Sequence, residues 1–290
     1  MGVVFETGYT TPSGYLLKED GGHLLKEDGG KILLEGGGAA GGARIAHARN
    51  WYEGGAATAS TTDADYFEDG PLDTDTVGGW KPATLPATWE YTHPFSFTAN
   101  YVCIGAHTLG STGAGYKIQY YGASGWADIT DTQYPKDDSP IMAVFTAKAS
   151  ARWRISIATA NSPPKVGIFR AGEALVMPQA IYGGHTPARF NRATTFRDNR
   201  SGSGEILGRT KLRTSLQASY SWTLLKADWI REYWDDMQLA IEGEPFFIAW
   251  RPDKFPDVEL ALSTNAAQPT NMGTRSYMQV TLSAMGYGYE

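Results

Sequence analysis

The fold is decided by the stretch Leu212-Arg-Thr-Ser-Leu-Gln-Ala-Ser-Tyr-Ser-Trp-Thr-Leu224. Its even positions are Leu, Thr, Leu, Ala, Tyr, Trp and Leu, whereas its odd positions are Arg, Ser, Gln, Ser, Ser and Thr. Successive side chains of a strand point to opposite faces of the sheet, so a period of two indicates a strand with one face buried. The stretch therefore predicts one long, half-buried strand.

The pattern changes directly after this strand. Trp229, Tyr233, Met237 and Ile241 recur at every fourth residue with charged residues between them, which predicts an amphipathic helix. The helix is expected to end at Gly243, before a proline. Further strands are predicted at Phe246–Trp250, Val258–Ser263 and Tyr277–Ala284. Residues 178–290 are thus expected to form an α+β sandwich, and residues 182–208, which are polar and rich in Gly and Arg, an extended loop or domain joint.

Residues 51–177 show short β-rich segments separated by clusters of Gly, Pro, Asn, Asp and Ser. Strands are predicted at Phe95–Ile104, Tyr116–Tyr121, Ile141–Thr146, Arg152–Ile157 and Val166–Arg170. No long run has the period of a helix, so an antiparallel β-sandwich is expected here. The chain as a whole is predicted to be mainly β.

Three near-identical octapeptides occupy residues 15–22, 23–30 and 31–38. Each pairs a short apolar run with a Glu-Asp-Gly-Gly or Glu-Gly-Gly-Gly breaker, which is typical of a minimal strand and a turn. Strands this short cannot bury a core alone, so we expect their edges to pair with another chain. The expected assembly residues are Leu16, Leu17, Leu24, Leu25, Ile32 and Leu33. Residues 1–50 are thus expected to form a β arm of repeats followed by a Gly-rich connector, and the alternative is a flexible, low-complexity N-terminal arm.

Composition excludes several classes of function. The 290 residues carry a formal net charge of −6 with no block of Lys or Arg, which argues against recognition of nucleic acid. The single cysteine excludes an internal disulfide framework. No run is long and apolar enough to suggest a membrane span, and residues 1–8 lack the features of a secretory signal. A soluble protein made in a cytoplasm is expected.

No catalytic constellation emerges from the sequence, and we expect neither an enzyme nor a cofactor. His93, Cys103 and His107 could be imagined as zinc ligands, but no fourth ligand is evident, and Cys103 lies in an apolar segment. The carboxylates of Asp235-Asp236 and of Glu242 and Glu244 could be imagined as a glycosidase pair, although charges between apolar helical positions usually form a solvated face.

Aromatic and arginine side chains of the middle region are the better candidates for a binding site. With 9 Trp and 16 Tyr in a chain that is 19% charged, stacking surfaces are abundant. Trp80 and Trp126 follow glycine-rich turns, and Tyr121, Arg152 and Arg154 are of the types that stack on sugar rings and bond hydroxyl groups. We therefore predict carbohydrate binding by Trp80, Tyr121, Trp126 and Arg152. The alternative, that most such aromatics belong to the core, is favoured for Trp153 and Tyr120.

Residues of about 56 to 175 resemble the discoidin, or galactose-binding-like, β-sandwich. The resemblance is carried by Ala56-Ala-Thr-Ala-Ser60, Asp69-Gly70, Thr76, Trp80, Tyr116-Lys-Ile-Gln-Tyr-Tyr121, Gly125-Trp126, Ala151-Arg-Trp-Arg-Ile-Ser-Ile157 and Val166-Gly-Ile-Phe-Arg-Ala-Gly172. It implies loops that bind sugars or lipid head groups at one end of the sandwich. The family's loops vary too much for the resemblance to assign individual binding residues.

A second resemblance is to tail proteins of long-tailed bacteriophages. The octapeptide repeat is similar to repeats of phage virion proteins, and Gly243-Glu-Pro-Phe-Phe-Ile-Ala-Trp-Arg-Pro-Asp-Lys-Phe-Pro-Asp257 is similar to tail-tip and distal-tail proteins. It implies a virion subunit that is made in the host cytoplasm and forms a ring of six at the tail tip. Tube, hub and fibre proteins would be its neighbours. The sandwich would face outward, for attachment of a fibre or contact with host glycan. The alternative is a host-glycan-binding module of a tail fibre or baseplate.

Deleting residues 15–38 is expected to leave both β-rich units folded and to impair assembly, because repeats this short cannot belong to a self-sufficient core. Thermal unfolding and the solution mass of the deletion variant measure the two effects. Loss of cooperative unfolding would show instead that the repeats belong to the core.

Overall fold

The computed structural model describes residues 3–5, 42–181, 183–273 and 276–287. The octapeptide repeats, and with them Leu16, Leu17, Leu24, Leu25, Ile32 and Leu33, lie outside the described residues. The described chain forms two β-sheets of seven and eight strands, one longer helical segment and two one-turn 3₁₀-helices, Gly70–Leu72 and Ala188–Phe190. The predicted fold class, a mainly β chain with one β-sandwich and a second unit that carries a helix, is confirmed.

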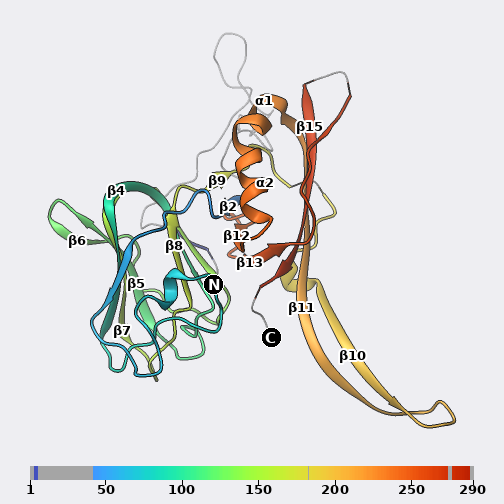
Figure 1. Cartoon of the computed structure of the whole chain (residues 1–290), viewed down its shortest axis with the longest axis horizontal. Helices are drawn as coiled ribbons and strands as arrows, with labels where there is room; N and C mark the ends of the chain where they lie inside the picture. Colours follow the sequence, from blue (N-terminus) through green and yellow to red (C-terminus); the bar gives the residue numbers. More distant parts are fainter. Residues whose placement is uncertain (1–2, 6–41, 182, 274–275, 288–290) are drawn as a thin grey trace, which may run out of the picture.

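The first sheet folds over itself into the sandwich at the left of Figure 1. Its strands are β1 (Val3–Phe5), β3 (Ala56–Ala59), β4 (Ala87–Gly105), β5 (Gly115–Gly122), β6 (Gly125–Asp128), β7 (Ile141–Thr159) and β8 (Ile168–Gly172). The two predicted strands at 141–146 and 152–157 are halves of the single strand β7. A one-turn 3₁₀-helix, Gly70–Leu72, interrupts the long loop between β3 and β4.

Strands β4 and β7 run through both layers of the sandwich. They are 19 residues long each and pair antiparallel along their length, with register shifts near Thr92 and Ala99 where the ribbon bends. One half of this ribbon pairs with β3 and β5, and the other half pairs with β8 and β1. The two layers enclose a core that includes Trp80, Trp89, Tyr91, Trp153, Ile104 and Phe145.

The second sheet has the order β10-β11-β15-β13-β12-β2-β9, with β14 paired to β15. Its strands are β2 (Arg44–Ala46), β9 (Leu175–Val176), β10 (Arg192–Arg200), β11 (Ile206–Lys226), β12 (Phe246–Ala249), β13 (Val258–Ser263), β14 (Thr270–Asn271) and β15 (Tyr277–Gly286). Strands β2 and β9 flank the sandwich in the sequence and pair with each other, so they tie the sandwich into this sheet.

The predicted helix is present and covers this sheet (Figure 1). It comprises α1 (Ala227–Trp229), a π-helical turn (Ile230–Trp234) and α2 (Asp235–Ile241). Its buried side chains, Trp234 among them, pack on the even positions of β11, and the rings of Trp222 and Trp234 meet at 6.0 Å. The Trp234 indole N–H donates a hydrogen bond to the carbonyl of Ala267, which satisfies its one polar atom. Among the described residues, no helix is long and apolar enough to cross a membrane.

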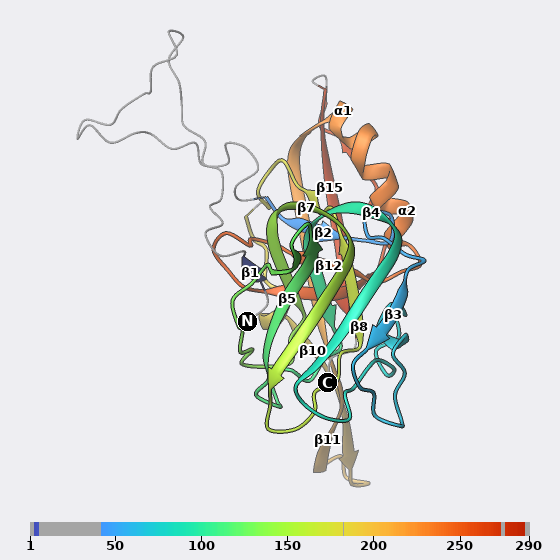
Figure 2. The ribbon, with the colours of Figure 1, turned by 90° about the vertical axis from the view of Figure 1, so that its left-hand side faces the viewer.

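The prediction of a loop or joint over residues 182–208 is wrong. Residues 192–200 form β10, which pairs antiparallel with β11 from Ile206 to Leu216. This two-stranded ribbon, here called the arm (residues 192–216), projects away from the rest of the molecule in Figures 1 and 2. No side chain of the arm is buried, and residues 192–211 show no apolar alternation from which a strand could be predicted.

The sandwich and the second sheet share a buried apolar cluster, here called the interface core. The strand segments 101–104 and 141–145 are buried on both faces: one face lines the sandwich core, and the other packs against β12 and β13. The interface core consists of Trp51, Tyr101, Cys103, Met142, Val144 and Ile168 from the sandwich side and Ala46, Phe247, Ala249, Val258 and Leu260 from the other. The two sheets are thus joined by packing as well as by the chain.

Polar contacts reinforce this junction. The Tyr101 hydroxyl donates to Oδ1 of Asn50 at 2.9 Å, and the Asn50 amide donates to the carbonyl of Ile45 on β2. Arg49 pairs with Asp236 of the helix at 2.6 Å, and Thr74 donates to Glu244 at 3.3 Å. Of the carboxylates considered as a glycosidase pair, Glu244 thus contacts the sandwich, and Asp236 contacts the segment that leads from β2 into it.

Replacing Leu260 by Ala is expected to lower the free energy of unfolding by about 2–5 kcal/mol, because it leaves a cavity in the interface core. The same substitution at Leu239, which is exposed on the helix, is the matched control and should change it by less than about 0.5 kcal/mol. Urea unfolding measures both. Equal, small effects would contradict a packed interface.

Candidate functional site

A partly exposed cluster of aromatic and guanidinium groups lies on the outer face of the sandwich. We call Tyr121, Trp126, Arg152 and Arg154 the Arg–aromatic patch. Tyr121 and Trp126 are paired residues of the β5–β6 hairpin, whose turn is possible because Gly125 adopts a φ of +102°. Three residues predicted to bind carbohydrate, Tyr121, Trp126 and Arg152, are thus brought together.

Strand alternation explains why these side chains share one face. On β7, Trp153 and Ile155 point into the sandwich core, so Arg152 and Arg154 point outward. On β5, the pairing of Tyr121 with Trp126 places both rings on the same outer face. The assignment of Trp153 to the core is confirmed: its side chain is fully buried.

The rings and the guanidinium groups are in contact. The ring centroids of Tyr121 and Trp126 lie 5.3 Å apart at an interplanar angle of 79°. The guanidinium carbon of Arg152 lies 4.4 Å from the Tyr121 centroid, and that of Arg154 lies 4.0 Å from the Trp126 centroid. Both distances fit cation–π contacts, which hold the long arginine side chains against the rings. Tyr121 remains 42% exposed.

Carboxylates and an amide orient these cations. Arg152 donates two hydrogen bonds to Glu90, through Nε and Nη2, and this hydrogen bonding raises the pKa of Arg152. Nε of Arg154 donates to Oε1 of Gln119 at 2.6 Å, while burial lowers the pKa of Arg154. The Gln119 amide donates to Asp128, whose pKa is lowered mainly by its hydrogen bond from Lys117. The patch therefore offers oriented donors and acceptors beside two aromatic rings.

Arg154 was named with Arg152 from the sequence as a residue type that bonds sugar hydroxyl groups, whereas Glu90 and Gln119 were not identified. The spacing of Arg152 and Arg154 within a strand places both cations on one face. The contributions of Glu90 and Gln119 depend on cross-strand register, in which Arg154 pairs with both, and register is not readable from one sequence.

Trp80 does not belong to this site. It was expected on an exposed turn, but its side chain is fully buried in the sandwich core. Its backbone pairs with Val166, and its indole N–H donates to the carbonyl of Thr61 at 3.0 Å. A ring without exposed surface cannot stack on a ligand, so Trp80 is removed from the candidate residues.

The three residues imagined as zinc ligands have separate roles. Cys103 is buried in the interface core, and burial raises the pKa of its thiol. The ring of His107 is buried and its Nε2 lies 2.9 Å from the carbonyl oxygen of Ser139; burial lowers its pKa to about 4. His93 lies between the carbonyls of Phe95 and Glu53. Within the described residues, no group of three His, Cys, Asp or Glu side chains converges as a metal site would require.

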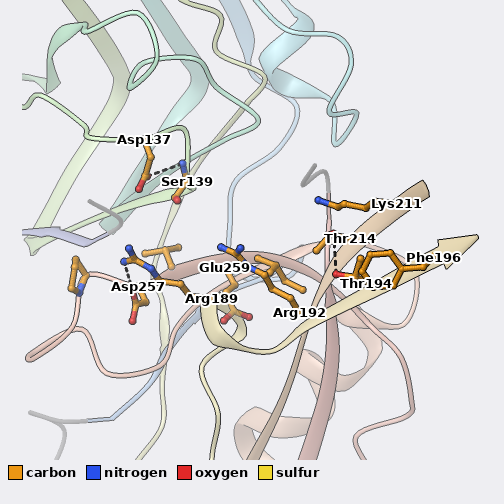
Figure 3. A pocket seen from close by; sticks show the side chains of 13 residues that line it. Asp137, Ser139, Arg189, Arg192, Thr194, Phe196, Lys211, Thr214, Asp257 and Glu259 are labelled. Atoms are coloured by element: carbon orange, nitrogen blue, oxygen red, sulfur yellow. Dashed lines mark hydrogen bonds and ion pairs between the residues drawn. The ribbon is translucent and has the colours of Figure 1, made fainter. Parts of the chain in front are cut away.

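A groove of about 470 Å³ lies where the arm meets the body of the molecule (Figure 3). One face of the arm lines it with Arg192, Phe196 and Lys211, and the sandwich contributes Asp137 and Ser139. Its remaining lining includes Arg189, which lies 3.8 Å from Asp257. The groove is open and its charges are mixed, so its lining does not single out one class of ligand.

A second hollow, of about 370 Å³, lies between residues 48–55, the loop at residues 72–74 and strand β8, and the buried cation Arg170 lines it. Arg170 donates to the carbonyls of Pro71 and Leu72 at 3.0 and 2.7 Å, and its guanidinium carbon lies 5.2 Å from the centroid of the Trp51 ring. Burial lowers its pKa. These bonds fix the loop around the 3₁₀-helix at residues 70–72, so the evident role of Arg170 is to anchor that loop.

Comparison with known proteins finds similarity to solved structures and none in sequence. No family model matches the chain, and no curated protein matches its sequence. A point mutant of chitosan-binding module 1, derived from a chitosanase/glucanase of Paenibacillus sp. IK-5, is similar at 22% identity over 44% of this chain and 98% of that chain, with a TM-score of 0.37.

Two further solved structures are similar over a comparable share of the chain. One is the family 32 carbohydrate-binding module of NanJ from C. perfringens, in complex with galactose, at 9% identity over 44% of this chain and 98% of that one, with a TM-score of 0.36. The other is a pectin-binding carbohydrate-binding module, at 13% identity over 42% and 88%, with a TM-score of 0.34. These likenesses are too distant to carry an argument about this chain, so the account of its function rests on its geometry.

Proposed function

We propose that the chain is a glycan-binding subunit of a larger assembly, in which the sandwich contacts carbohydrate through the Arg–aromatic patch. The observation that carries the proposal is the clustering of two aromatic rings and two anchored guanidinium groups on one sheet face, where Tyr121 is exposed and the other three side chains are partly exposed. In this proposal the residues of the patch bind and orient a glycan without turnover.

The chemistry of the patch suits a sugar. Aromatic rings present an apolar surface to the C–H groups of a pyranose, and they do so at a low cost in conformational entropy. Arg152 and Arg154 supply N–H donors for hydroxyl and ring oxygens, and Glu90 and Asp128 supply acceptors for hydroxyl protons. Because the hydrogen bonds and cation–π contacts hold these groups in place, little further ordering is needed on binding.

Replacing Trp126 by Ala is expected to weaken binding to a responsive glycan at least about 10-fold, because one stacking surface is lost and Arg154 loses its support. A glycan array with wild-type protein identifies the ligand, and calorimetric titration then gives the Kd of wild type and variant.

The matched control is Tyr134→Ala, which removes another exposed aromatic ring of the sandwich that is not part of the patch. It should leave the Kd unchanged. Binding lost in the Tyr134 variant and retained in the Trp126 variant would place the sugar elsewhere, and the absence of any glycan bound by wild type would contradict the proposal itself.

A second candidate function is the structural one: a ring-forming subunit of a phage tail tip, of distal-tail type, located in the virion. The observation that favours it is the arm, a two-stranded ribbon with exposed Phe196, Ile206, Leu207 and Leu212. An isolated ribbon of this kind is only marginally stable in water, so its length and its apolar side chains are best explained by contact with another molecule.

In this candidate the second sheet builds the ring, the sandwich faces outward to hold a fibre protein or host glycan, and tube and hub proteins are the other neighbours. Light scattering on a sizing column, with negative-stain images of the peak, should show closed rings, with six as the expected number. A monomer at all concentrations up to about 1 mM would count against self-assembly and would leave the glycan-binding proposal standing.

A further inference from the structure

The arm and one loop of the sandwich carry opposite charge. The arm, residues 192–216, holds five arginines and one lysine against one aspartate and one glutamate, a net charge of +4 in a chain of net charge −6. The loop between β3 and β4 holds five aspartates and one glutamate at residues 63–75, with no lysine or arginine, a net charge of −6. We call residues 63–75 the acidic loop.

The two faces of the arm have different surroundings. Paired residues of an antiparallel ribbon share a face. Arg192, Thr194, Phe196 and Lys211 line the groove toward the sandwich of the same chain. Arg197 and Arg213 pair with Thr210 and Thr195, on the opposite face, and this outer face turns away from the groove.

Within the part of the chain that the structure describes, the arginines of the outer face form no ion pair. Both of these arginines, Arg197 and Arg213, are exposed. In contrast, Arg209 on the other face forms a two-point hydrogen bond with Asp198. Leu212, at the register shift beside Arg213, is 58% exposed and adds an apolar side chain.

The acidic loop is complementary and is held in place. Asp65, Glu68 and Asp69 are exposed, and Phe67 between them is 71% exposed. Arg170 binds the carbonyls of Pro71 and Leu72, and Trp89 donates its indole N–H to the carbonyl of Glu68. The loop therefore presents an apolar side chain surrounded by carboxylates on a fixed backbone.

We propose that the outer face of the arm of one copy docks on the acidic loop of a second copy, with Arg197 and Arg213 facing Asp65 and Asp69, and Phe67 meeting the apolar side chains of the arm. The proposal rests on the assembly role proposed above and specifies which surfaces meet between neighbouring copies. The two surfaces are different, so the contact is heterologous and each copy uses both surfaces, which leads to a closed ring or a filament. Because salt screens ion pairs between exposed groups, this association should weaken at high ionic strength.

Charge reversal tests the contact. The arm variant Arg197→Glu/Arg213→Glu makes both surfaces acidic, and the loop variant Asp65→Lys/Asp69→Lys lowers the acidity of the loop while the arm stays basic. Each variant alone should self-associate at least about 10-fold more weakly than wild type, as measured by sedimentation equilibrium. An equimolar mixture should recover association, because the acidic arm then meets the lysine-bearing loop, and the basic arm meets the acidic loop.

The matched control is Arg231→Glu/Lys254→Glu, which makes the same change in net charge as the arm variant at exposed positions outside the arm and the acidic loop. It should associate as wild type does. Unchanged thermal unfolding verifies that each variant is folded.

The possible outcomes distinguish a failure of the proposed contact from a failure of the assembly role. If wild type assembles and the arm and loop variants assemble equally well, or if the mixture fails to recover, the proposed contact is wrong while the assembly role stands. If wild type is monomeric throughout, both are wrong.

Discussion

The interface core is the interaction on which the rest of the structure depends. The central segments of β4 and β7 are buried on both faces, one inside the sandwich and the other against β12 and β13. Burial of this apolar surface, at about 25 cal/mol per Å², holds the two sheets in one orientation. Through that orientation the Arg–aromatic patch, the acidic loop and the arm are kept in fixed positions relative to one another. If the junction were flexible, the sandwich would only be tethered to the second sheet. Because the junction is packed, the sandwich and the second sheet form one rigid body.

Much of the fold could be predicted from the sequence, wherever one face of a strand or helix is buried. The alternation from Leu212 to Leu224 predicted the inner half of β11, and the four-residue period after it predicted the helix that packs there. The predicted strand at Val258–Ser263 has the observed bounds. The outer half of β11 and all of β10 were missed because the arm has no buried face, and a strand that buries nothing leaves no apolar period. The segments 101–104 and 141–145, which are buried on both faces, are continuous apolar runs in the sequence. Such a run predicts burial but does not predict which element packs on the second face.

The candidate site was likewise predicted from the sequence only in part. Tyr121, Trp126 and Arg152 could be predicted from residue type and position near a turn, whereas Trp80, chosen on the same grounds, is a core residue. Glycines before Trp80 indicated a turn but not which way the indole points, and that direction is decided by tertiary packing. The orienting groups, Glu90 and Gln119, come from neighbouring strands whose register one sequence does not reveal. The opposite charges of the arm and the acidic loop are visible in the sequence, but the fold is needed to show that Arg197 and Arg213 lie on one face of the arm, without an ion pair to any carboxylate of the described residues.

Differential scanning calorimetry of the wild-type chain tests the central claim, that the sandwich and the second sheet form one body, most directly. The account predicts a single transition whose calorimetric and van't Hoff enthalpies are equal, because loss of either unit would expose the interface core and destabilise the other. Two resolved transitions, or a calorimetric enthalpy about twice the van't Hoff value, would contradict it, since the binding patch and the arm would then lie on independent domains.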